Sequence, residues 1–346
     1  MTTPVQTSNA ATPPPHTTAK HSHTNVLLNT SRTTSTRELT SYENVICGAT
    51  AGLVSRFLVA PFDVVKITLQ LETHRPSFSL LRPTGVFACA RRIFQREGIK
   101  GLFKGNLSAE YLYLTYGATQ FLVFSSIEKG LRGVRMPKKA RSFVGGALAG
   151  AVATSVTYPF DLLRTRFIAQ EINNRVHDSI VGAVRQIARE EGFRGFYRGL
   201  WPACLQIMPY MGIVFTCYDA LGSGYRWIRR SLIVSDSQAM RALDSVQDAL
   251  IGGGSAVIGK CCVYPLDLVR KRLQVQGPHL HSYAHGSVPM YTGMSNALLY
   301  IVRNEGFLAL FRGLTPALIK AAPASATIFY IYGYTRDLIL TLKPEQ

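Results

Sequence analysis

Long apolar segments alternate with short polar ones along most of the chain. From about Ser41 the residues are small or apolar almost without interruption over 44–60, and further apolar segments occupy roughly 107–131, 200–225 and 314–342. The last three are long enough to cross a bilayer, which takes about 20 residues. This pattern predicts membrane-spanning helices.

Shorter amphipathic segments lie between the apolar ones. Residues 84–97, 178–191 and 292–305 carry apolar side chains at helical spacing with charges between them, which is typical of a helix lying at an interface. With one apolar segment before each of them and one after, the sequence predicts an all-α membrane protein. It would have six spanning helices and three short interfacial ones.

Two short motifs recur three times each and divide the chain into repeats. The first is Pro-x-Asp-x-x-basic, which begins at Pro61, Pro159 and Pro265. The second is Glu-Gly followed by aromatic-basic-Gly, at 97–105, 191–199 and 305–313. Recurrence at intervals of about a hundred residues indicates internal repeats. The predicted organisation is a tail over 1–40 and repeats over 41–135, 138–232 and 243–342.

A step between small residues precedes each proline motif. Its copies are Gly48 with Gly52, Gly146 with Gly150, and Gly252 with Ala256. Such steps let helix backbones approach closely in lipid. We therefore expect tight helix packing at these positions.

Charge and composition narrow the function. The 346 residues are 47% hydrophobic and carry a formal net charge of +18. Only 17% of them are charged, which is low for a nucleic-acid-binding protein, and no DNA- or RNA-binding motif occurs. A basic chain with long apolar segments is more typical of a membrane protein that faces anionic lipid or carries anionic solutes.

The cysteines give no sign of a metal site or a disulfide framework. The six of them form no Cys-x-x-Cys pair, and no histidine stands near them at zinc-ligand spacing. An enzyme is not expected either, because the sequence has no phosphate-cradling glycine-rich loop and no acid–base constellation outside the repeated motif.

Residues 1–40 differ from the rest of the chain. They are rich in Ser, Thr and Pro and show no periodicity, which predicts a disordered tail. No acidic residue precedes Glu38. That composition is typical of a transit peptide, although the arginine-rich amphipathic helix of such peptides is missing. A hydrophobic signal-peptide region is absent too, so secretion is not expected.

Over residues 41–342 the two repeated motifs resemble those of the mitochondrial carrier family of inner-membrane solute transporters. The resemblance implies six transmembrane helices with pseudo-threefold symmetry, three short matrix-side amphipathic helices and a multi-pass location in the mitochondrial inner membrane. It also implies transport by alternating access in a functional monomer, without a cofactor.

Within the family, three stretches are similar to fungal carriers of thiamine pyrophosphate. They are Lys104–Asn106 with Tyr113–Phe121, Thr157–Arg166, and the lysine at 320. The similarity implies import of thiamine pyrophosphate, as a transported substrate and not a cofactor, in exchange for nucleotides or thiamine monophosphate. Coenzyme A and adenine nucleotides remain alternatives, although Arg270–Gln274 lacks the Arg-Arg-Arg-Met-Met-Met run of ADP/ATP carriers. A non-transporting membrane adaptor is a further alternative, against which the intact motif charges argue.

The proline motif carries an acid and a base three residues apart, so each acid can reach the base of a neighbouring helix when three such helices surround one axis. The family's arrangement implies the pairs Asp63–Arg164, Asp161–Arg270 and Asp267–Lys66 on the matrix side of a central cavity, braced by Gln70 and Gln274. Ile168 leaves the second repeat without a brace. The alternative is a set of solvated surface pairs worth about 0–1 kcal/mol each.

The family's substrate contacts lie seven to eight residues after each aromatic-basic-Gly turn. Here they imply Tyr113, Gln206 and Lys320, with Arg56 and Lys260 adding positive charge lower in the cavity. Tyrosine can stack on a ring, glutamine both donates and accepts, and lysine binds phosphate. A ring-bearing, multiply anionic solute fits this set. Helix packing of Tyr113 and Gln206, and snorkelling of the lysines, are the alternatives.

The opposite, cytoplasmic gate of the family is eroded in this sequence. Asp219 with Arg336 is the one obvious pair on the even-numbered spanning helices. We therefore expect weak closure at that end, and a resting state open toward the cytoplasm.

The aromatic-basic-Gly turns begin helices, whose free backbone N–H groups bind phosphates. In the family these turns hold cardiolipin. The resemblance therefore implies a lipid site at Lys104, Gly105, Arg198, Gly199, Arg312 and Gly313.

Overall fold

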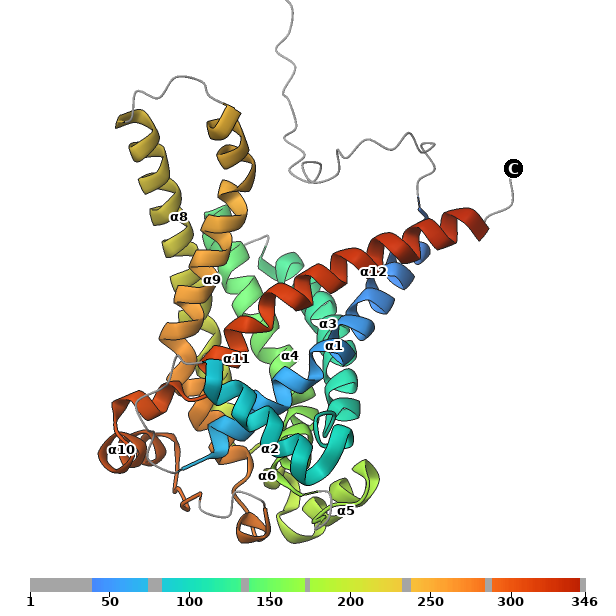
Figure 1. The fold of residues 1–346 in the computed structure, drawn as a ribbon, viewed down its shortest axis with the longest axis vertical. Coiled ribbons are helices and arrows are strands. Elements are labelled where there is room, and N and C mark those ends of the chain that lie inside the picture. Colours follow the sequence, from blue (N-terminus) through green and yellow to red (C-terminus); the bar gives the residue numbers. More distant parts are fainter. Residues whose placement is uncertain are drawn as a thin grey trace, which may run out of the picture. The chain divides into compact units, whose positions relative to one another are not determined.

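The computed structural model describes residues 39–73, 83–131, 137–171, 175–231, 238–283 and 288–342. Residues Leu39–Gln346 form one compact unit, and its described part contains helices and no strand (Figure 1). The predicted all-α fold is therefore confirmed. The predicted tail over 1–40 lies outside the described residues, apart from Leu39 and Thr40.

The elements follow the predicted threefold repetition. In order they are α1 (Ser41–Leu71), α2 (Pro83–Gly101), α3 (Asn106–Leu131), α4 (Lys138–Ala169), α5 (Ile180–Glu190), α6 (Gly192–Gly195), α7 (Leu200–Leu205), α8 (Ile207–Ser231), α9 (Gln238–Gln274), the 3-10 helix η1 (Leu280–Ser282), α10 (Met294–Asn304), the 3-10 helix η2 (Phe307–Phe311), α11 (Leu314–Ile319) and α12 (Ala321–Leu342). Each repeat thus has one long helix with an internal proline, one short amphipathic helix, and a second long helical segment.

The second long segment is continuous in the first repeat and interrupted in the other two. α7 gives way to α8 at Gln206, and α11 to α12 at Lys320. Three residues further on stand Pro209 and Pro323, which lack the N–H that would continue the helical hydrogen-bond ladder. The first repeat has Thr115 at this position, and α3 runs through it unbroken. Two predicted substrate contacts therefore lie at helix breaks.

Five helical stretches of the described chain are long and apolar enough to cross a membrane. They are Tyr42–Leu71, Phe143–Ala169, Leu200–Trp227, Gln247–Gln274 and Phe307–Leu342. The sixth predicted span is α3, whose 26 residues would extend about 39 Å. Its tyrosine, threonine, serine and glutamine side chains make it less apolar, so a span there stays a prediction from length and repeat position.

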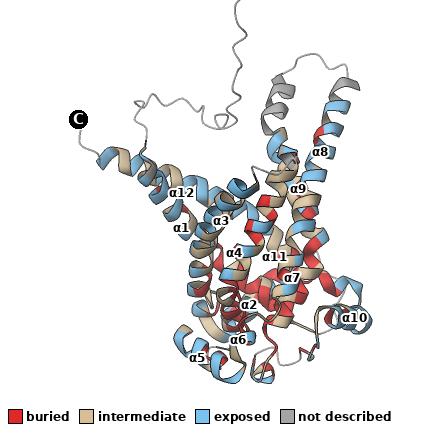
Figure 2. Ribbon diagram, turned by 180° about the vertical axis from the view of Figure 1, so that it is seen from behind, coloured by how far each residue is buried: buried red, intermediate tan, exposed pale blue. Residues whose placement is uncertain are grey.

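Helices from adjacent repeats pack along one another. The principal pairs are α3 with α4, α8 with α9, and α12 with α1. The three helices that carry the motif proline, α1, α4 and α9, also contact one another; we call them the proline-containing helices. Buried residues concentrate around their junction (Figure 2). Beyond it, the pair α8 and α9 diverges from the pair α1 and α12 (Figure 1).

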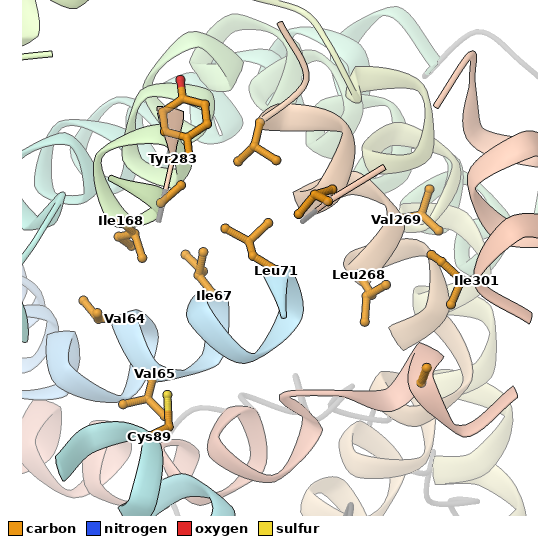
Figure 3. Close-up of a cluster of buried hydrophobic side chains, with 14 of the residues drawn as sticks. Val64, Val65, Ile67, Leu71, Cys89, Ile168, Leu268, Val269, Tyr283 and Ile301 are labelled. Carbon is orange, nitrogen blue, oxygen red and sulfur yellow. The ribbon is translucent and has the colours of Figure 1, made fainter. Parts of the chain in front are cut away.

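Apolar side chains fill the space around the junction. Val64, Ile67 and Leu71 of α1 belong to one buried cluster with Ile168 of α4 and Leu268 of α9 (Figure 3). A second buried cluster lies against α4, where Ala183 and Ile187 of the short amphipathic helix α5 pack with Leu162 and Leu163. The proline-containing helices are therefore held firmly at one end.

The glycine steps permit close helix packing, but four of their five glycines make no such contact in this conformation. A Cβ added to Gly48, Gly52, Gly146 or Gly252 would meet no other atom within 4 Å. Only Gly150 is approached, by the Ile207 side chain at 3.5 Å from such a Cβ. Gly48 and Gly52 instead line a hollow between α1 and α3 of their own repeat.

Candidate functional site

Three ion pairs connect the proline-containing helices in a ring, with one pair between each two helices. The pairs are Arg164–Asp63 at 2.7 Å, Lys66–Asp267 at 2.7 Å and Arg270–Asp161 at 2.8 Å. Each helix supplies one acid and one base to different neighbours, as expected from the motif. We call these six residues the ionic layer.

Burial distinguishes the ionic layer from ordinary surface pairs. The paired side chains are only 6–14% exposed. Removing one partner of a buried pair typically costs about 3–5 kcal/mol, because the other charge stays buried. The solvated-pair alternative therefore does not describe these residues, whereas their role as a gate stays a prediction.

Both glutamine braces contact the layer. Gln274 donates to Asp161, and Gln70 donates to Asp267 at 3.4 Å and to the Tyr264 hydroxyl at 3.1 Å. Ile168 packs in the apolar core instead. The second repeat therefore contributes no brace, as its sequence indicates.

Each acid of the layer also holds a second base. Lys320 bonds to Asp63, Lys260 lies 3.3 Å from Asp267, and Lys271 lies 2.9 Å from Asp161. We call these three lysines the second bases. Sequence reasoning missed Lys271; the only signal was its place directly after the motif base Arg270, and that position is not basic in the other two repeats.

A cavity of about 310 Å³ lies against the ionic layer. Its charged lining consists of Lys66, Arg164, Lys260, Arg270, Lys271 and Lys320 with Asp63, Asp161 and Asp267, a formal excess of three positive charges. Of the predicted substrate contacts, Tyr113, Gln206, Lys260 and Lys320 line it. The buried Oε1 of Gln206 has no hydrogen-bond partner among the described residues, so it is available to a ligand.

Arg56 lies elsewhere than predicted. It lines a second hollow of about 370 Å³ between α1 and α3, not the cavity at the ionic layer. Its guanidinium stacks on the Tyr113 ring, 3.6 Å from the centroid, a favourable cation–π arrangement. The Tyr113 hydroxyl in turn accepts from Arg164 at 3.3 Å. Tyr113 therefore links the ionic layer to this second hollow, a contact that spacing along the chain does not reveal.

The expected pair between Asp219 and Arg336 is not among the ion pairs of the described chain. Asp219 is exposed on α8, and α8 diverges from α12, which carries Arg336 (Figure 1). Among the described residues, the end of the bundle opposite the ionic layer, called the far end below, therefore has no counterpart of that layer in this conformation.

The glycines of the aromatic-basic-Gly turns lock each repeat to the next. Gly105, Gly199 and Gly313 have φ of 68°, 82° and 81°, a left-handed conformation that favours glycine. A Cβ on Gly105 would lie 2.8 Å from the Arg164 carbonyl oxygen, and one on Gly313 would lie 2.8 Å from that of Lys66. These turns therefore press directly on the backbone of the motif bases.

The basic residues of the same turns bind acids of the chain. Lys104 pairs with Glu97 at 2.8 Å, Arg312 with Glu305 at 2.8 Å, and Arg198 with Glu191 at 3.1 Å. The three basic side chains predicted to contact lipid are therefore already paired with glutamates of the repeated Glu-Gly motif. The turn glycines border two hollows of about 190 and 490 Å³.

Two fully buried arginines form hydrogen bonds and ion pairs that connect adjacent repeats. The sequence analysis did not identify them. Arg166 binds both oxygens of Glu191 and also the Gln274 backbone carbonyl at 3.1 Å. Arg272 does the same with Glu305 and the Gln70 carbonyl at 3.1 Å. The available signal was a second base two residues after the motif base, which the first repeat replaces with Thr68.

Outside the spanning segments, a histidine cluster joins the loops of the second and third repeats. His177 is 2% exposed and lies 2.8 Å from Gln186, whose amide is 2.8 Å from His279. Burial lowers the pKa of His177 below its ordinary value. His177 is therefore most favourably accommodated in its neutral form.

The sequence of the chain is similar to those of known proteins over most of its length. The profile described as mitochondrial carrier protein matches residues 37–135, 137–227 and 241–343. A protein of Phaeosphaeria nodorum is 45% identical over 316 residues, covering 87% of this chain and 94% of its own length. One of Botryotinia fuckeliana is 44% identical (88% and 94%), and one of Ajellomyces capsulatus 46% (85% and 90%). All three carry the name mitochondrial thiamine pyrophosphate carrier 1.

Proposed function

The chain belongs to the mitochondrial carrier family, and on that premise we propose that it carries thiamine pyrophosphate into the mitochondrial matrix by exchange. The main support is identity of about 45% to the thiamine pyrophosphate carriers over most of the chain. The protein would act in the inner membrane as a transporter and not as an enzyme. Nucleotides or thiamine monophosphate would be the counter-substrates.

The cavity at the ionic layer supports an anionic substrate. It carries six bases and three acids, so it attracts a diphosphate electrostatically. Lys260 of α9 and Lys320 at the junction of α11 and α12, both in the third repeat, line it, and lysine is a common point-charge partner of phosphate.

Lys320 gives a physical route from substrate binding to opening of the ionic layer. In the ligand-free structure it bonds to Asp63. A diphosphate entering the cavity competes for the same ammonium group, which leaves Asp63 held by Arg164 alone among its two basic partners. The closed layer is weakened only to the extent that the ligand binds the opening state better than the closed one. No covalent step is needed.

We further propose that anionic lipid, cardiolipin in particular, binds between repeats at the aromatic-basic-Gly turns. The two hollows there are bordered by Gly105 and by Gly199, and the first also has Lys100, Lys104 and Arg175 in its lining. Backbone N–H groups at a helix start favour phosphate. A single chain supplies all three ion pairs, so the working unit would be a monomer.

Transport assays test the substrate assignment. Purified protein is reconstituted in liposomes containing cardiolipin, preloaded with unlabelled thiamine pyrophosphate, and given labelled thiamine pyrophosphate, coenzyme A or ADP outside. We expect uptake of thiamine pyrophosphate that requires internal substrate and is not matched by the other two. If thiamine pyrophosphate neither enters nor competes while coenzyme A or ADP does, the substrate assignment is wrong and the family assignment stands.

A further inference from the structure

Glu110 on α3 is an acid that the ionic layer does not use. Both of its carboxylate oxygens are buried, and neither has a hydrogen-bond partner within the described chain. Asn106 stands beside the carboxylate one turn earlier, and Arg56 attracts it electrostatically, but no ion pair between Arg56 and Glu110 forms. Glu110 as a whole is half-buried, and a carboxylate shielded from water without a direct partner costs free energy, so a ligand that supplied a cationic or N–H partner would be bound favourably.

Glu110 lines the second hollow, between α1 and α3, together with Arg56 and the glycines of α1. Tyr113 and Tyr116 line both this hollow and the cavity at the ionic layer. The two spaces are therefore neighbours across a tyrosine wall.

The two spaces differ in charge. Nearly all of the basic groups gather in the first cavity, around Lys320. The second has one acid, Glu110, and one base, Arg56, whose guanidinium is already stacked on the Tyr113 ring, so its formal charges balance and Glu110 is its one carboxylate. Thiamine pyrophosphate has the same division, since its diphosphate is anionic while its thiazolium ring carries a fixed positive charge and its aminopyrimidine ring bears N–H donors.

We propose that Glu110 is a specificity-determining contact that binds the cationic ring end of the substrate while Lys320 binds the diphosphate. This inference rests on the proposed function and names the part of the site that reads the ring. The carboxylate attracts a thiazolium cation and repels the ring-bearing anions that lack one, such as coenzyme A and ADP. Selectivity built on both attraction and repulsion is a common device of specific sites.

The test compares two ligands that differ only in ring charge. The first is thiamine pyrophosphate, and the second is its thiophene analogue, in which carbon replaces the thiazolium nitrogen and abolishes the charge. Each competes for uptake of labelled thiamine pyrophosphate by liposomes containing the wild type, Glu110→Gln or Glu128→Gln. Glu128 is an exposed acid on the same helix, so its variant is the matched control. The ratio of the two apparent affinities does not depend on the fraction of protein that is folded.

For the wild type and Glu128→Gln we expect the charged ligand to compete about tenfold better than the neutral one, the size of effect that one close charge pair provides. In Glu110→Gln the preference should fall to about twofold or less. An unchanged ratio in Glu110→Gln, or equal weakening of both ligands, would overturn the role of Glu110 while leaving the transport assignment intact. Failure of the wild type to take up thiamine pyrophosphate would instead overturn the transport assignment and this inference with it.

Discussion

The two ends of the helix bundle are built on opposite principles. At the ionic layer, three aspartates only 4–5% exposed hold bases from neighbouring helices, and apolar clusters pack around them. At the far end, Asp219 is exposed, and Gly48 and Gly52 face empty space. Both ends belong to the same repeats. The contrast indicates that most of the interactions closing this conformation are concentrated at one end.

The ionic layer is itself less symmetric than its motif. Each aspartate is bound by a motif base from the next helix and also by one of the second bases, Lys320, Lys271 or Lys260. The motif bases occupy equivalent positions in all three repeats, whereas the second bases come from three different positions. The layer of motif ion pairs is thus the repeated feature, whereas the second bases, which include the proposed solute contact Lys320, do not follow the repeat.

The largest expected effect comes from removing an acid of the ionic layer. Asp161→Ala leaves Arg270 and Lys271 buried without their carboxylate, so we expect a loss of stability of about 3–5 kcal/mol and loss of transport. The readout is thermal unfolding in detergent. Asp219→Asn at the exposed far end is the control and should change stability by no more than about 0.5 kcal/mol. Equal destabilisation by both variants would remove the distinction between the two ends.

The next effect separates transport from stability. Lys320→Ala removes the second base of Asp63 but leaves Arg164 in place, so we expect the protein to stay folded. Uptake of thiamine pyrophosphate should fall by about a hundredfold or more, which corresponds to about 2.7 kcal/mol. Initial uptake rates and the melting temperature of the same preparation provide the two readouts. Near-normal uptake would show that Lys320 is not part of the substrate site.

A smaller effect is a dependence of stability on pH, which we expect to arise from His177 near the ionic layer. Burial holds the pKa of His177 below its ordinary value of 6.5, so the unfolded chain binds more protons there than the folded one. The free energy of unfolding should therefore fall as the pH drops below about 6.5. His177→Gln should flatten the dependence of melting temperature on pH between 7.5 and 5.5.

The control is His281→Gln, which replaces an exposed histidine of η1. It should keep the full pH dependence of the wild type. A slope that the His177 variant leaves unchanged would mean that the stability loss in acid comes from other groups.

Much of the fold could be predicted from the sequence because the same elements and motifs recur in three repeats. The amphipathic segment predicted at 178–191 is α5 with its flanking residues, and the acid–base pairs are the three that the motif implies. A residue type recurring three times in one register constrains partners on three helices together. Which base each acid binds, Lys66 for Asp267 among them, was implied by the resemblance to the carrier family, and the ion pairs agree with it.

Features unique to one repeat could not be obtained this way. Lys271 reaches Asp161, and Arg56 stacks on Tyr113, because of how neighbouring helices are rotated and shifted against each other. Spacing along one helix does not encode that relation. The glycine steps are a different case: Gly48 and Gly52 permit close packing but do not enforce it, and the helices at the far end lie apart in this conformation.

Cross-linking across the far end tests the central claim most directly, namely that the ligand-free carrier is closed at the ionic layer and open at the far end. All six native cysteines are free, so they are first replaced, and the cysteine-free protein is checked for transport. Asp219→Cys and Arg336→Cys are then introduced together, and disulfide formation is followed with and without thiamine pyrophosphate. We expect slow cross-linking in the ligand-free protein and a marked increase when substrate drives the far end closed. Rapid cross-linking without substrate, unchanged by its addition, would contradict the account.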